Sequence, residues 1–220
     1  MSLLALPLFA GFFPQTVHTS IVKITGKTSF LKNPLPVAGM SGVIIHNYGN
    51  DMHAITNYIV QKDQKNLSLI EEVTIDHDKL PTIKTAVSMG DKVIGGYLYN
   101  NVLLLAPDAQ TYAKITSQHD KNWVHPDLFA LFLSKVGDTV PNKKNLKAFA
   151  KSHQVGLIYI IGNGTAKLLD PISGRIVGQK ILSDLPTLAK SPFFTHFDEV
   201  GSSWIAEKPK NNYYQIMDKI

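Results

Sequence analysis

The sequence predicts an α+β protein, with a small N-terminal antiparallel β-barrel or sandwich, an α/β layer and an aromatic-rich irregular tail. Three observations support this fold class. Short β-branched runs alternate with glycine turns from residue 17 to about residue 100. Residues 102–150 combine a buried-strand pattern with helical periodicity. Residues 155–181 return to strands joined by tight turns.

Turn residues delimit the strands of the N-terminal part. Gly26 ends the first run, Gly49-Asn50 lies in a turn after the second, and Gly90 precedes the last. No convincing amphipathic helix interrupts these runs. We therefore expect antiparallel strands at residues 17–25, from Val43 onward, at 54–60, at 67–73 and after Gly90.

The second part begins with Val102–Ala106, a continuous apolar run typical of a strand buried on both faces. Helix-start and helix-stop residues then recur along the chain. We expect three helices, from Asp108 through Lys114, from Pro126 to Gly137, and from about Asn142 past Phe149. A three-stranded meander follows at 155–161, 165–169 and 175–181, with Gly162-Asn163-Gly164 as its first hairpin turn. The strand, the helices and the meander form a layer beside the barrel.

The tail after Pro186 has no clear periodicity but many aromatic side chains: Phe193, Phe194, Phe197, Trp204, Tyr213 and Tyr214. Because exposed aromatic clusters are costly, we expect most of them to pack on the body or on a partner. We divide the chain into a signal-peptide remnant (1–13), a barrel-like part (14–100), an α+β part (101–186) and this tail (187–220).

The N-terminal apolar run at residues 3–13 carries no charge and ends at Gly11 and Pro14. It is shorter than the about 20 residues that span a bilayer, and it suits the apolar region of a secretory signal with processing after Ala10. The alternative is a buried N-terminal strand or helix. No later stretch is long and apolar enough to be transmembrane. We expect export to the periplasm, the outer membrane or the cell surface.

Composition excludes several protein classes. With 44% hydrophobic residues and no cysteine among 220, the chain is neither disordered nor a disulfide scaffold. Arg175 is the single arginine among 22 basic residues, so 21 are lysines and the formal net charge is +5. Specific nucleic-acid readers rely on arginine, so we expect no nucleic-acid partner. Lys143, Lys144, Lys147 and Lys151 share one helix face, which is either a solvated face or an anion site.

Catalytic motifs are missing from the sequence. There is no GxSxG elbow and no GxxxxGK[ST] loop, and the glycines at 162 and 164 precede a strand rather than a helix. Glu71 and Glu72 are adjacent on a predicted strand and point to opposite faces. We therefore expect a protein that is not an enzyme and that needs no cofactor.

The eight histidines have no metal-binding spacing such as HExxH. His77 lies between Asp76 and Asp78, where the residues indicate a polar loop. His46 and His53 bracket a predicted hairpin turn and can face each other across it, although an exposed or hydrogen-bonded histidine is the expected role. The sequence predicts no metal site.

Several segments, taken in order, resemble a known family. They are Gly39-Met40-Ser41-Gly42-Val43-Ile44-Ile45-His46, Gly90-Asp91-Lys92-Val93-Ile94 through Tyr97-Leu98-Tyr99 to Leu104-Leu105-Ala106-Pro107, His125-Pro126-Asp127-Leu128-Phe129-Ala130, Val155-Gly156-Leu157-Ile158 and Pro192-Phe193-Phe194-Thr195. In this order they resemble the N-terminal domain of bacterial plasminogen-binding surface proteins, from about Phe13 to the end. These motifs are turn glycines and packing aromatics rather than catalytic residues.

The resemblance implies export to the envelope and binding of host plasminogen, whose kringle domains bind lysine side chains. In the family, a lysine-rich region beyond this domain, ending in lysine, suits that role. The present sequence closes with Asp218-Lys219-Ile220. We therefore expect Lys208, Lys210 and Lys219 to be the surface lysines that enter the lysine-binding pockets of plasminogen.

A structural role is the alternative. The chain would then be a scaffold in an envelope complex, for example as an accessory of a flagellar or other assembly. In this case Trp204, Tyr213 and Tyr214 would anchor an envelope-complex subunit.

Overall fold

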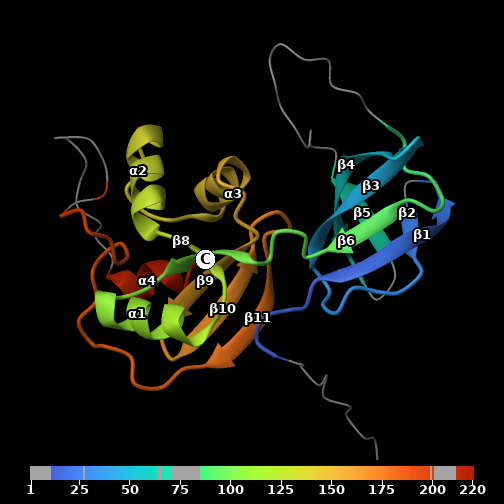
Figure 1. Ribbon diagram of the computed structural model, residues 1–220. Helices are drawn as coiled ribbons and strands as arrows, with labels where there is room; N and C mark the ends of the chain where they lie inside the picture. The colour runs from blue at the N-terminus through green and yellow to red at the C-terminus, as the bar shows by residue number, and fades with distance from the viewer. Residues whose placement is uncertain (1–10, 27, 64–65, 71–84, 199, 201–211) are drawn as a thin grey trace, which may run out of the picture.

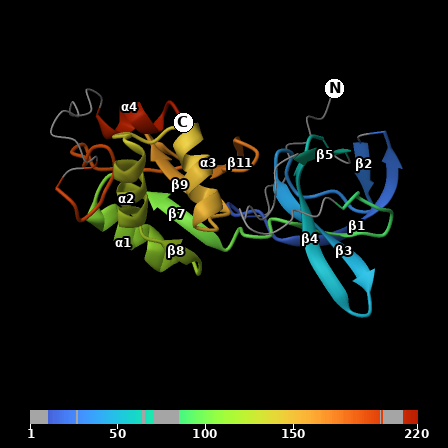
Figure 2. The ribbon, with the colours of Figure 1, turned by 90° about the horizontal axis from the view of Figure 1, so that it is seen from above.

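The computed structural model describes residues 11–220 except 27, 64–65, 71–84, 199 and 201–211. A closed β-barrel and a mixed sheet with helices lie side by side (Figure 1). Phe12 and Phe13 lie beside the sheet, the chain then crosses to the barrel at β1, and it returns from the barrel between β6 and β7 (Figure 2). The predicted α+β class is confirmed.

Six antiparallel strands form the barrel in the order β1-β2-β5-β4-β3-β6, and β6 pairs with β1 to close it. They are β1 (Val17–Thr25), β2 (Thr28–Leu31), β3 (Ser41–Gly49), β4 (Met52–Gln61), β5 (Asn66–Ile70) and β6 (Lys92–Gly95). The predicted barrel-or-sandwich resolves into a barrel. Strand β2 was not expected from the sequence, because four residues are too few to show a period of two.

Two glycines allow β3 and β6 to approach each other. Gly42 lies opposite Gly95 in the ladder. A Cβ atom at Gly42 would lie 2.5 Å from the Ile94 carbonyl oxygen, and one at Gly95 would overlap the Leu35 side chain. Leu35 is buried. The absence of side chains at these two positions thus lets the barrel close around its apolar interior.

The second sheet has the order β11-β10-β9-β7-β8. Its strands are β7 (Asn101–Leu105), β8 (Asn122–Val124), β9 (Leu157–Gly162), β10 (Thr165–Asp170) and β11 (Arg175–Ile181). Strand β7 runs parallel to β8 and β9, whereas the meander β9-β10-β11 is antiparallel. Residues of β7 and β9 contribute alternately to two apolar clusters, one on each face, as predicted for Val102–Ala106.

The helices are α1 (Ala109–Gln118), α2 (Pro126–Val136), α3 (Lys143–Ser152) and α4 (Tyr213–Met217). The first three match the predicted helices, and their start signals are used: Asp108 and Asn142 accept hydrogen bonds from Thr111 N–H and Asn145 N–H. Gly137 ends α2 with φ of 77°. None of the helices in the described part of the chain is long and apolar enough to cross a membrane.

Strand β8 and helix α4 were not expected. The tail was predicted to be irregular, yet Asn212 and Gln215 form a capping box that starts a short helix. Tyr213, Ile216 and Met217 bury one side of this helix against the face of the sheet that also carries α2 and α3. Burial of these three side chains stabilises a helix that is too short to persist alone.

Phe12 and Phe13 pack on the body. Both rings contact Tyr159, at centroid distances of 5.1 and 6.1 Å. Lys180 Nζ lies 4.5 Å from the Phe12 ring centroid, and Lys121 Nζ lies 4.8 Å from that of Phe13. Processing after Ala10 would leave both aromatic residues in place.

Candidate functional site

The barrel and the sheet are joined by a buried carboxylate. Asp170, at the end of β10, is fully buried and its Oδ2 accepts hydrogen bonds from Ser41 N–H (2.7 Å) and the Tyr99 hydroxyl (2.6 Å). Its Oδ1 accepts from Ile172 N–H (2.9 Å) and Ser173 N–H (3.0 Å). Burial and the negative charge of Asp170 raise the pKa of Tyr99 well above its usual value. The carboxylate therefore connects β3, the β6–β7 segment and the β10–β11 turn.

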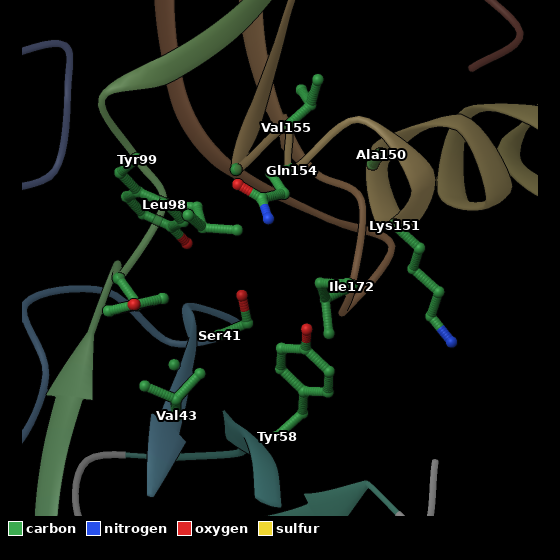
Figure 3. Close-up of a pocket in the computed structure, with 13 residues that line it drawn as sticks. Ser41, Val43, Tyr58, Leu98, Tyr99, Ala150, Lys151, Gln154, Val155 and Ile172 are labelled. Atoms are coloured by element: carbon green, nitrogen blue, oxygen red, sulfur yellow. The ribbon is translucent and has the colours of Figure 1, made fainter. Parts of the chain in front are cut away.

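A pocket of about 50 Å³ lies beside this carboxylate (Figure 3). Its walls come from both parts of the protein: Ser41, Gly42, Val43 and Tyr58 of the barrel, Tyr97, Leu98 and Tyr99 of the connection, and Ala150, Lys151, Gln154, Val155, Gly156 and Ile172. Figure 3 shows the Tyr58 hydroxyl and the Gln154 amide directed into the hollow from opposite walls. A drug-sized or nucleotide-sized ligand needs about 300–1,000 Å³, so this pocket suits a single side chain.

Gly156 keeps the two walls of this pocket together. A Cβ atom there would overlap the backbone of Leu98, so only glycine permits the contact. Gly156 N–H also donates to the Asn101 carbonyl at 3.0 Å. This close approach fixes the start of β9 against the segment that leaves the barrel.

The lysine face of α3 adjoins the pocket. Lys143, Lys144 and Lys151 are exposed and Lys147 is half-buried, while Leu146, Phe149 and Ala150 are buried on the opposite side of the helix. The four lysines share one face, as the helical spacing predicted. Because Lys151 also lines the pocket, a side-chain-sized hollow lies at the edge of a cationic surface.

Three of the six predicted binding residues, Tyr213, Tyr214 and Lys219, lie in the described part of the chain, in α4 or directly after it. Lys219 is exposed just beyond α4. Tyr213 is fully buried, and its hydroxyl shares its proton between the carbonyls of Leu105 (2.7 Å) and Ile161 (2.8 Å). Tyr214 is half-buried and its hydroxyl donates to the Pro186 carbonyl at 2.7 Å. Both tyrosines therefore bind the tail to the body, and a partner would reach the Tyr213 ring only if α4 left the sheet.

The other predicted binding residues, Trp204, Lys208 and Lys210, lie outside the described residues. They stay predictions. The helix that carries Tyr213 had a signal in the sequence, an asparagine followed three residues later by glutamine. Its burial had none, because the carbonyls that it binds lie 108 and 52 residues away.

The two barrel histidines do not form the cross-strand pair that we considered. His46 lies opposite Ala54, and His53 lies opposite Asn47, so the register is one residue away from a direct pair. His46 Nδ1 instead lies 2.8 Å from Asp91 Oδ1. His77 and its flanking aspartates lie outside the described residues.

A group of two histidines and one aspartate was not expected from the sequence. His125, Asp127 and His196 lie together at the start of α2, although 69 residues separate Asp127 from His196. Within the described part of the chain they are the group whose three potential ligand atoms lie close together, within 4.8 Å of one another. His125-Pro126-Asp127 was recognised as a helix start, but no local pattern indicates that the tail returns to it.

Hydrogen bonds keep Asp127 ionised. Burial alone would raise its pKa, but hydrogen bonds from the Thr195 hydroxyl and from the backbone and ring of His196, together with the electrostatic effect of His125, lower the pKa of Asp127 to about 2. Thr195 Oγ1 donates to Oδ1 at 2.6 Å and His196 N–H donates to the same oxygen at 2.9 Å.

Comparison with known proteins identifies the family. The model of the family described as "Plasminogen-binding protein pgbA N-terminal" matches residues 16–220. The chain belongs to this family. Its relatives include the plasminogen-binding protein PgbA of Helicobacter pylori strain J99 and that of strain 26695, each 26% identical over 147 residues. The match covers 64% of this chain and 32% of each relative, so the chain spans about a third of their length.

No solved structure matches the chain. The predicted family resemblance is confirmed, and the relatives are named as binding proteins rather than as enzymes. The structure adds two features that family membership alone does not describe. These are the pocket between barrel and sheet, and the histidine–aspartate group at α2.

Proposed function

We propose that this chain is an exported, non-enzymatic binding module that captures plasminogen through its lysine side chains. Membership of the family over residues 16–220 is the observation that carries the proposal. The composition supports the lysine mechanism, because 21 of the 22 basic residues are lysines and kringle pockets bind lysine.

Of the three lysines proposed to bind plasminogen, Lys219 is the one that the structure describes. It is exposed next to Asp218, whose Oδ1 accepts a hydrogen bond from Asn163 N–H at 3.2 Å and is thereby held at the surface. A kringle that binds a terminal lysine recognises both an ammonium and a carboxylate, and this neighbouring pair supplies both charges. Lys208 and Lys210 complete the proposed set.

Plasminogen binding measured by surface plasmon resonance tests this proposal. A lysine analogue should abolish binding, and changing Lys208, Lys210 and Lys219 together to alanine should weaken it more than about tenfold. The same three changes to arginine keep the charge and serve as the matched control. Equal loss in both variants supports recognition of lysine itself, whereas full retention in the alanine variant contradicts this site.

The lysine face of α3 is the second arm of that experiment. Changing Lys143, Lys144, Lys147 and Lys151 to alanine alters exposed or half-buried positions without disturbing the apolar side of α3. If this variant loses plasminogen and the first one does not, the binding surface lies beside the pocket rather than in the tail.

Export is part of the proposal and has its own test. The apolar run at residues 3–13 supports it. N-terminal sequencing of the protein recovered from periplasmic and outer-membrane fractions should show a chain that begins at Gly11. An unprocessed chain recovered from the cytoplasm would contradict export.

A scaffold role is the second candidate, and an exposed apolar stripe on α2 favours it. Leu128 and Leu131, three residues apart on one side of this helix, are 45 and 54% exposed, and Val136 at its end is 49% exposed, which is a surface suited to a protein partner. Capture from solubilised envelope, with and without a lysine analogue, separates the two functions. A stoichiometric partner that is indifferent to the analogue and lost in Leu131→Lys would support the scaffold.

A further inference from the structure

The group at the start of α2 presents three ligand atoms of the kinds that transition metals prefer. Asp127 Oδ2 lies 2.9 Å from His196 Nδ1 and 3.4 Å from His125 Nδ1. The other oxygen, Oδ1, already accepts hydrogen bonds from Thr195 and from the His196 backbone. The oxygen that faces both imidazoles is thus oriented by hydrogen bonds to its neighbour, which is how outer partners position a metal-binding carboxylate.

We propose that His125, Asp127 and His196 form a binding site for a divalent transition-metal ion of the zinc class. Two imidazole nitrogens and one carboxylate oxygen are ligands that Zn²⁺ and its neighbours in the first transition row bind well. Ligands placed about 2.0–2.1 Å from one ion lie at most about 4.2 Å apart. The three atoms already lie within 4.8 Å of one another, so a small movement completes the set.

That movement falls on His196. The two imidazole rings are stacked, with centroids 5.0 Å apart and planes 13° apart. Because a ring nitrogen donates its lone pair in the plane of the ring, parallel rings cannot both face one ion. The His196 side chain is 67% exposed, so its ring has room to turn out of the stack and away from its edge contact with Phe194 at 5.4 Å.

The His125 ring needs a smaller change. Its Nδ1 accepts a weak hydrogen bond from Asp127 N–H at 3.2 Å, which caps α2. A bound ion would take the place of this bond. The rings of Tyr112 and Phe194 contact the His125 ring edge-on, with centroid distances of 5.4 and 6.3 Å. These contacts restrict the orientation of the His125 ring. The site is therefore closed on its aromatic side and open on the side of His196, where water would complete the coordination.

Zinc titration of the chelator-treated full chain, followed by calorimetry and metal analysis, tests the proposal. We expect one equivalent of Zn²⁺. His196→Ala should weaken binding by more than the about 10–100-fold that typically follows loss of an outer partner. His18→Ala is the matched control, because His18 is an exposed histidine on β1, and it should bind zinc as the parent does.

Two further measurements separate a metal site from a structural ion-pair group. Thr195→Val keeps the shape but removes the hydrogen bond to Oδ1, and should weaken zinc binding by about 10–100-fold. Saturating Zn²⁺ should raise the melting temperature of the parent and leave that of His196→Ala unchanged, because only a bound ion stabilises by mass action. Substoichiometric zinc in the parent, or equal affinity in His196→Ala, would overturn the proposal.

Discussion

The barrel and the mixed sheet protect their backbones in different ways. Each barrel strand has two hydrogen-bonded neighbours, so the barrel has no free edge. The mixed sheet ends at β8 and β11, and is instead covered by apolar clusters on both faces. The barrel thus pairs every strand edge around an apolar interior, whereas the sheet keeps two edges and buries both of its faces under side chains brought from distant segments.

Two groups of histidine–aspartate contacts among the described residues follow the same division. In the barrel, Asp91 pairs with His46, its second oxygen accepts from Ser88 N–H at 2.7 Å, and its side chain is 5% exposed. Beside the sheet, Asp127 faces two histidines and its side chain is 23% exposed. The same residue types therefore close a turn in one region and leave an accessible oxygen in the other.

The largest effect should follow from removing the carboxylate that joins the two regions. Asp170→Ala leaves Ser41 N–H and the Tyr99 hydroxyl buried without their acceptor. We expect urea unfolding to show a loss of about 3–5 kcal/mol. The exposed Asp120→Ala is the control and should change stability by less than about 0.5 kcal/mol. A similar small change in Asp170→Ala would show that the barrel and the sheet associate without it.

Alkaline pH should act first on the sheet and on its junction with the barrel. Burial raises the pKa values of Tyr99, Tyr159 and Tyr213. The folded state therefore favours the neutral phenol more strongly than the unfolded state does. The free energy of unfolding is then constant with respect to these tyrosines below their ordinary pKa of about 10. Above that pH it falls by up to about 1.4 kcal/mol per pH unit for each tyrosine. Tyrosinate absorbance from these residues should appear together with loss of protection of β9 amides in hydrogen exchange.

Tyr159→Phe is the matched test of that interpretation. The Tyr159 hydroxyl is buried and has no hydrogen-bond partner among the described residues. Its removal should leave stability at neutral pH unchanged or increased, and should reduce the alkaline sensitivity. If the variant is as sensitive to alkali as the parent, burial of this phenol does not set the pH dependence.

Closure of the barrel should be sensitive to a single methyl group. Gly42→Ala meets the Ile94 backbone, so we expect a loss of about 1–3 kcal/mol. Gly95→Ala meets the Leu35 side chain instead, which can move, so its cost should be smaller. Hydrogen exchange should report the change in β3 and β6 and not in β9. Equal costs for the two glycines would argue against backbone contact as the limiting factor.

A smaller loss than that of Gly42→Ala is expected at a helix start in the sheet region. Asn142→Ala removes the capping box of α3 and should cost about 1 kcal/mol in thermal or urea unfolding. Asn142→Ser retains a capping oxygen and should differ from the parent by only a few tenths of that amount. A larger loss in the alanine variant would mean that the cap also holds the lysine face of α3 in position.

Much of the fold was predictable because its signals are local. Proline, asparagine and glycine marked the ends of α2 and α3, and the continuous apolar run at 102–106 indicated a strand buried on both faces. Strands β2 and β8, with four and three residues, are too short for a period to be recognised. Helix α4 was missed because its stability comes from Tyr213, whose hydroxyl binds carbonyls of β7 and β9.

The sequence by itself determined the α+β class, the order of most elements, the dominance of lysine among basic residues, and the family resemblance. Closure of the barrel, the Asp170 junction and the meeting of Asp127 with His196 were decided only by the tertiary structure. Capping, turn and periodicity signals act over a few residues, whereas the Asp170–Ser41 contact spans 129 residues and the Asp127–His196 contact spans 69. Whether such side chains meet depends on how whole layers pack, and no local pattern records it.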